Sequence, residues 1–227
     1  MSVANSAFYG FHTPVKTLRN AIMRIGFNSV RNIAVGIAIM TVLHDENHRG
    51  TPDYERIFNH SVAVAFISSL LSKRTGYGIT DEIVISGILH DMGLLILSRH
   101  FPERYMDVMN KFEEGKTLYD AEKEVFDFSH CEIGNWLASK WSLPDTVADT
   151  ILYHHKPSQA AQNMVHIATV HVADFIVDNH VIRATAGDYS APFDPSSLDL
   201  LGMSEKTLND VVTEVKSGSL FNELFIV

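Results

Sequence analysis

Apolar residues recur at intervals of three and four along almost the whole chain. Val30, Ile33, Ala34, Ile37 and Ala38, for example, would lie on one face of a helix. No long stretch alternates between apolar and polar residues, and no Asn-Gly or Asp-Gly dipeptide marks a hairpin turn. The pattern therefore predicts an all-α fold, a helical bundle with short connections.

The apolar stripes place the main helices at residues 53 to 75, 80 to 99, 129 to 141, 144 to 155 and 162 to 178. The helix over 80 to 99 is apolar on both faces, which indicates a central, buried element. The acidic stretch from Tyr119 to Val125 is interpreted as a solvated helix with charge partners four residues apart. We expect one domain, with a bundle over residues 1–182 and a loop and C-terminal helix over residues 183–227 that pack on it.

Charge and composition exclude several classes of function. The chain has 18 basic and 27 acidic side chains and a net charge of −9, and its basic residues are scattered, so nucleic acid is not an expected partner. A single cysteine rules out a disulfide framework within the chain and favours a reducing compartment, the cytoplasm. The apolar stretch Ile33 to Leu43 is about half of the roughly 20 residues that a membrane span needs, so no membrane is expected either.

The chain has 12 histidines, and their positions on the helices are informative. Four histidines and two aspartates fall on apolar stripes, namely His60, His90, Asp91, His130, His154 and Asp174. A buried carboxylate is costly unless it is paired or bound to a cation. Imidazoles and carboxylates converging in a bundle suit iron, manganese, zinc or nickel. A set of hydrogen-bonded core histidines without metal is the open alternative.

The other histidines and the cysteine carry weaker signals. Cys131 follows His130 on the same helix and is predicted to point elsewhere and to be inert, which leaves no thiolate to select copper. His44, Asp45 and His48 lie in a polar turn and are interpreted as surface residues. No spacing argument applies to His12, His100, His166, His171 or His180.

The run Ile85-Ser-Gly-Ile-Leu-His-Asp-Met-Gly-Leu-Leu-Ile-Leu97 resembles the signature helix of the HD superfamily, and specifically of the HDOD group of bacterial signalling domains. Several other segments resemble that family in order and spacing. They are Asn5-Ser-Ala-Phe-Tyr-Gly10, Asn59-His-Ser-Val-Ala63, Ser129-His-Cys-Glu-Ile-Gly134, Trp141-Ser-Leu-Pro144 and Ile151-Leu-Tyr-His-His155. The resemblance implies an all-α HD-superfamily bundle.

The resemblance also implies a ligand set for one or two divalent ions. The family's pattern of histidine, histidine-aspartate and distal aspartate falls on His60, His90, Asp91 and Asp174. The additional histidines of binuclear relatives fall on His130 and on His154 or His155. In an active enzyme Asp91 would also serve catalysis.

The chain departs from active relatives in ways that affect function. Leu94 stands where those relatives commonly have a lysine that neutralises a substrate phosphate. Lys156 and Pro157 follow His155 with no glutamate and no Gly-Tyr-Pro segment, so hydrolysis of cyclic di-GMP is not expected. The family's domain normally has several further helices before the Asn-Ser-Ala-Phe-Tyr motif, which here starts at residue 5.

Three functions follow as hypotheses. The first is a regulatory HDOD domain of bacterial signal transduction with degenerate or no catalysis, whose partners are other signalling proteins or domains, a nucleotide ligand or a second copy of the chain. The second is a metal-dependent phosphohydrolase acting on a nucleotide, a cyclic dinucleotide or another phosphate ester. The third is a non-catalytic interaction scaffold.

Overall fold

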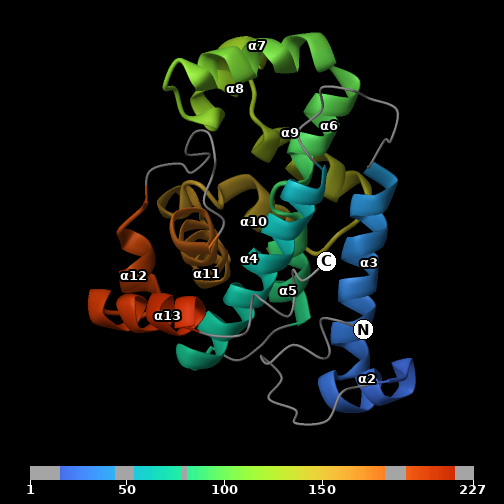
Figure 1. The fold of residues 1–227 in the computed structure, drawn as a ribbon, viewed down its shortest axis with the longest axis vertical. Helices are drawn as coiled ribbons and strands as arrows, with labels where there is room; N and C mark the ends of the chain where they lie inside the picture. The colour runs from blue at the N-terminus through green and yellow to red at the C-terminus, as the bar shows by residue number, and fades with distance from the viewer. Residues whose placement is uncertain (1–15, 44–53, 78–80, 182–192, 218–227) are drawn as a thin grey trace.

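The computed structural model describes residues 16–43, 54–77, 81–181 and 193–217. This part of the chain contains helices and no strands, so the all-α prediction is confirmed (Figure 1). The helices, in chain order, are α2 (Leu18–Ile25), α3 (Phe27–Leu43), α4 (Tyr54–Arg74), α5 (Asp81–Leu89), α6 (Met92–His100), α7 (Pro102–Glu113), α8 (Leu118–Phe126), α9 (His130–Lys140), α10 (Asp145–Tyr153), the short 3-10 helix η2 (Pro157–Gln159), α11 (Met164–Ile176), the π-helical turn η3 (Val177–Val181), α12 (Ser196–Leu200) and α13 (Glu205–Ser217). The motif at residues 5–10, the turn expected at residues 44–48 and most of the loop expected at 183–197 lie outside the described residues.

The central layer of the bundle is formed by α4 and α5, which pack side by side (Figure 1). Helix α3 packs on α5, and α11 packs on α4. Helices α9 and α10 pack against each other and connect to the central layer, α9 through α6 and α10 through α5. The pair α7 and α8 covers one end of the bundle, while α12 packs on α11 and α13 contacts η3. The helices that pack directly on the central layer are thus α3, α10 and α11.

Two glycines allow neighbouring helices to pack closely. A Cβ atom at Gly87 would lie 2.4 Å from the Cα atom of Ala65, so only a glycine permits α4 and α5 to approach as they do. A Cβ atom at Gly93 would lie 2.0 Å from the carbonyl oxygen of His130, which fixes the start of α9 against α6. Both contacts are with backbone atoms, which cannot rotate away.

The expected single helix over residues 80 to 99 is wrong in one respect, because the helix is interrupted at His90 and Asp91. Asp91 has φ −101° and ψ 12°, outside the α-helical region. The ring Nδ1–H of His90 donates to the carbonyl oxygen of Gly87 at 2.8 Å, an oxygen that would accept from the backbone N–H of residue 91 in a continuous helix. The side chain thus competes with the helical hydrogen bond, and the interruption lets two adjacent side chains face the same point.

Within the described residues one stretch, Glu82–His100, is long and apolar enough to cross a membrane by length and composition. Of that stretch 78% is buried inside the protein, as is usual for a core element. The stretch also contains the interruption between α5 and α6.

The start of α9 is set by local hydrogen bonds. The Glu132 carboxylate accepts from the backbone N–H of Ser129 at 2.7 Å and from its hydroxyl at 3.0 Å, as in a capping box. Asp127, with φ 66°, ends α8 in the left-handed conformation. These two features turn the chain back so that His130 becomes the first residue of a helix that points at the bundle core.

Candidate metal centre

All seven predicted ligands lie in the described residues and come together in the bundle core. They are His60 on α4, His90 and Asp91 at the interruption between α5 and α6, His130 at the start of α9, His154 and His155 at the end of α10, and Asp174 on α11. Most are buried, with exposed fractions of 0% for His90 and His154 and 1% for His130. The six residues selected by spacing and His155, which the family resemblance added, therefore meet in space, although they come from distant parts of the chain.

Four of these side chains form a first group around His60. Its Nε2 atom lies 3.0 Å from Asp174 Oδ1, 3.2 Å from His90 Nε2 and 3.7 Å from Asp91 Oδ2. His90 Nε2 lies 3.3 Å from Asp91 Oδ2 and 3.6 Å from Asp174 Oδ1. Four donor atoms that are each about 2.1 Å from one ion lie about 3.0 to 3.4 Å apart in octahedral or tetrahedral geometry. The group therefore fits a single divalent transition metal ion.

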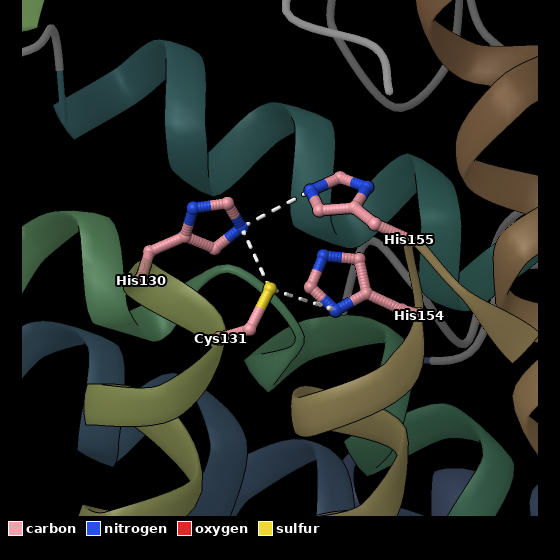
Figure 2. Close-up of side chains that lie close together, drawn as sticks. All are labelled: His130, Cys131, His154 and His155. Carbon is pink, nitrogen blue, oxygen red and sulfur yellow. Dashed lines mark hydrogen bonds between the residues drawn. The ribbon is translucent and has the colours of Figure 1, made fainter. Parts of the chain in front are cut away.

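A second group lies on the other side of the Asp91 carboxylate. Asp91 Oδ1 is 3.4 Å from His130 Nε2 and 3.4 Å from His154 Nε2. His130 Nε2 is 3.1 Å from His155 Nε2 (Figure 2). These separations also match those of ligands around one ion. Asp91 thus presents one oxygen to each group, and both His154 and His155 lie in the second group.

The remaining ring nitrogens are held by groups around the centre. The Nδ1–H groups of His90 and His154 donate to the carbonyl oxygens of Gly87, at 2.8 Å, and of Ile151, at 2.9 Å. His130 Nδ1 is 2.7 Å from the carboxylate of Glu122, and His60 Nδ1 is 3.2 Å from that of Asp178. Because each Nδ1–H is used outside the centre, Nε2 is the nitrogen that faces the centre, and the neutral ring offers there the lone pair that a metal-ligating histidine requires.

The electrostatics of the centre favour positive charge. Burial alone would lower the pKa of His60, but the Asp178 and Asp174 carboxylates raise it well above its usual range. Burial would raise the pKa values of Asp91 and Asp174, but the surrounding imidazoles hold both well below the usual range. Burial together with His154 and His130 lowers the pKa of His155. In the metal-free protein the two ionised carboxylates favour protonated imidazoles around them, and a bound cation would replace those protons as the neutralising charge.

Three residues of the centre were missed or misassigned from the sequence. Glu122 was assigned to a solvated helix, but it is fully buried and also accepts from the backbone N–H of His130 at 2.8 Å. Asp178 follows Asp174 by four residues, and that helical spacing was the available signal. Cys131 was predicted to point elsewhere, and this is wrong, since its Sγ atom lies 3.4 Å from His130 Nε2.

Two further histidines have structural roles. His171 donates through Nδ1 to the carbonyl oxygen of His154 at 2.7 Å and accepts from the backbone N–H of Asp194 at 2.9 Å, so it supports the segment that carries His154. His166 Nε2 is 3.0 Å from the hydroxyl of Ser86, away from both groups.

Comparison with known proteins finds a family model that matches the chain. The family model for the HDOD domain matches residues 1–157. An uncharacterised protein of Treponema pallidum (strain Nichols) is 24% identical over 164 residues, which cover 71% of this chain and 31% of that protein. The chain therefore spans about a third of the length of this curated relative.

Three solved structures are similar over nearly the whole chain. An HDOD domain protein of unknown function from Geobacter sulfurreducens has 27% identity and a TM-score of 0.80, covering 100% of this chain and 80% of that one. A "Putative signal transduction protein" of Marinobacter aquaeolei VT8 has 21% identity and a TM-score of 0.76, covering 98% and 50%. A "Putative phosphohydrolase" of Shewanella amazonensis SB2B has 20% identity and a TM-score of 0.70, covering 98% and 82%. The last two likenesses establish the fold alone.

Proposed function

The chain belongs to the HDOD domain family, and from this premise we propose that it is a regulatory module of bacterial signal transduction whose core binds divalent transition metal ions. The proposal includes a cytoplasmic location and, as partners, other signalling proteins or domains, a nucleotide ligand or a second copy of the chain. The observation that carries the metal part is the convergence of two donor groups on the opposite oxygens of Asp91.

Each donor group has the composition of a metal site. The first combines two imidazoles with two carboxylates, and the second combines three imidazoles with the shared Asp91. Mixed nitrogen and oxygen donors suit iron, manganese, zinc or nickel. When bound, such ions stabilise charge on a phosphoryl group and lower the pKa of a water molecule. One or two ions per chain are expected.

Two observations favour a regulatory module over an enzyme with rapid turnover. Leu94, which is 6% exposed, occupies the place where the active relatives carry a phosphate-neutralising lysine. The side chains of His60 and Asp91 are only 12% and 15% exposed, and their neighbours in the centre are buried more deeply. A bulky phosphate ester would have little access to donors enclosed in this way, whereas a retained ion would be held firmly.

The position of Asp91 favours one second candidate, a metal-dependent phosphohydrolase. A carboxylate that faces two adjacent ions is suited to in-line displacement at phosphorus, where both the attacking and the leaving oxygen need stabilisation. In this case Asp91 would serve catalysis as well as binding. The name of the Shewanella amazonensis structure is consistent with this candidate.

The test is elemental analysis of protein purified without a metal-affinity step. We expect one to two transition metal ions per chain in the wild type, a clear loss in Asp91→Asn, and full metal content in His166→Gln, which removes a histidine that contacts Ser86 instead of the centre. Absence of metal from the wild type, with no measurable affinity for added manganese, iron, zinc or nickel, would refute the metal part.

Turnover then separates the two candidates. The regulatory proposal expects the metal-loaded protein to hydrolyse nucleotides and cyclic dinucleotides far more slowly than the roughly 1 to 1,000 per second of ordinary enzymes. Hydrolysis within that range, lost in Asp91→Asn and retained in His166→Gln, would refute the regulatory proposal and establish the phosphohydrolase.

A further inference from the structure

Cys131, the single cysteine of the chain, lies inside the second donor group. Its side chain is buried, and its Sγ atom is 3.4 Å from His130 Nε2 and 4.0 Å from His154 Nδ1. Figure 2 shows the sulfur between the rings of His130 and His154, with the ring of His155 next to that of His154. We propose that Cys131 is a thiolate ligand at this position and that it makes the position selective for zinc, an inference that rests on the proposed metal binding.

The distances agree with a shared ion. A tetrahedral zinc ion at about 2.3 Å from sulfur and about 2.1 Å from nitrogen places these two atoms about 3.6 Å apart and two nitrogens about 3.4 Å apart. The observed separations are 3.4 Å for Cys131 Sγ and His130 Nε2, and 3.1 Å for His130 Nε2 and His155 Nε2. Shifts of a few tenths of an ångström would therefore complete the geometry.

An independent observation points to a cation at the same place. His154 Nε2 is buried, faces Asp91 Oδ1 at 3.4 Å and makes no hydrogen bond. The Nδ1–H of His154 already donates to the carbonyl oxygen of Ile151, so Nε2 is the ring nitrogen that a cation entering the group could bind, with release of any proton that Nε2 carries. A buried nitrogen without a partner is costly, and a metal ion removes that cost.

A simple hydrogen bond is the rival explanation. The Cys131 thiol could donate to His130 Nε2, whose ring is protonated at Nδ1 opposite Glu122. This bond accounts for the 3.4 Å between Cys131 Sγ and His130 Nε2, but it leaves His154 Nε2 without a hydrogen-bond partner. A cation would engage both atoms, and its binding would release the thiol proton to water without any oxidation or reduction.

The thiolate would make the two positions chemically different. The group around His60 contains only nitrogen and oxygen donors, which also suit manganese and iron. The group around His130 would add a soft sulfur donor, and thiolate together with imidazole suits zinc. A chain with both groups filled could then hold two different metals, zinc beside Cys131 and a harder ion beside Asp174.

The experiment is a cobalt titration of the metal-free full chain, followed by absorption spectroscopy. A cobalt ion bound to a thiolate gives a charge-transfer band in the near ultraviolet, and here the band can come only from Cys131 because the chain has no other cysteine. We expect the band in the wild type and in Asp174→Asn, which changes a donor of the group around His60 and none of the contacts of Cys131. We expect no band in Cys131→Ser. We also expect this variant to bind zinc at least about tenfold more weakly than the wild type in the group around His130, with unchanged affinity in the group around His60.

The outcomes separate the two proposals. If the wild type binds cobalt without the band, and zinc affinity is the same in Cys131→Ser, the thiolate ligand is refuted while metal binding stands. If the wild type binds no metal, the proposed metal binding is refuted and the thiolate ligand with it. Circular dichroism and thermal unfolding of metal-free Cys131→Ser provide the folding control, and zinc-edge X-ray absorption should find a sulfur neighbour at about 2.3 Å in the wild type alone.

Discussion

Replacing Gly93 by alanine tests whether the contact between α6 and α9 positions His130. The added Cβ would lie 2.0 Å from the carbonyl oxygen of His130, whereas ordinary contact begins near 3.4 Å, so the two backbones must separate by roughly 1.4 Å. Overpacking of a core costs about 1 to 3 kcal/mol, and a clash with backbone atoms belongs at about 3 kcal/mol, while alanine regains about 0.5 to 1 kcal/mol of helix propensity. We expect the free energy of unfolding of the metal-free protein to fall by about 2 kcal/mol.

The same displacement should affect metal binding. Ligand distances in a metal site tolerate shifts of about 0.2 Å, and the movement of His130 is several times larger. An ion at 100 times its dissociation constant stabilises the native protein by about 2.7 kcal/mol. In the presence of metal the variant should therefore be less stable than the wild type by about 5 kcal/mol.

The assay is urea unfolding of both proteins, with a chelator and with added zinc or manganese. Gly134→Ala is the matched control, because it adds the same methyl group to α9 but meets the side chain of Ile151 at 2.7 Å and no backbone atom closer than 3.5 Å. The control should lose about 1 kcal/mol and keep its metal affinity. If Gly93→Ala unfolds like the wild type and binds metal equally well, the contact does not position His130.

Three further predictions concern other parts of the chain. Glu122→Gln should weaken metal binding at the His130 position by about 10 to 100-fold and leave the His60 position unchanged, as measured by a two-site titration; an equal loss at both positions would contradict the role of Glu122. In the metal-free protein, Cys131 and Asp91 overcome the effect of burial and raise the pKa of His154 to about 10, so the stability from this group should be complete below about pH 6.5 and decrease as the pH rises towards 10. Unfolding in chelator across that range tests the sign, and a His154→Gln variant should show a smaller slope. Thr117→Ala removes the hydroxyl that accepts from the backbone N–H of Asp120 at 3.1 Å, and it should cost about 1 kcal/mol without changing metal content.

The sequence was sufficient to select side chains that meet in the core because the signal for their burial is local. His60, His90, His130 and His154 each sit on an apolar stripe of their own helix, and the stripe alone shows that the side chain faces the core. No knowledge of the neighbouring helices was needed. The helix limits were predicted for the same reason, within a few residues, at residues 53 to 75 and 129 to 141.

The missed features depend on tertiary contacts. Glu122 belongs to a charged stretch, and it becomes buried because the turn at Asp127 brings His130, the first residue of α9, back against it. Cys131 is adjacent to His130 in the first turn of α9. Both side chains reach the second donor group because His154 and His155, at the end of α10, approach the start of α9. The interruption at His90 arises from competition between a side chain and the backbone for one carbonyl oxygen, which apolar periodicity does not detect.

The distribution of the donors along the chain also determines when in folding an ion can act. The ligands extend from residue 60 to residue 174 and lie on five separate parts of the bundle. Closing the loops between them requires most of the helices to be in place, so the complete donor set forms only late in folding. Interactions that form after the transition state slow unfolding and hardly change the rate of folding. Scarcity of metal would therefore shorten the lifetime of the folded protein and leave the speed of its maturation unchanged.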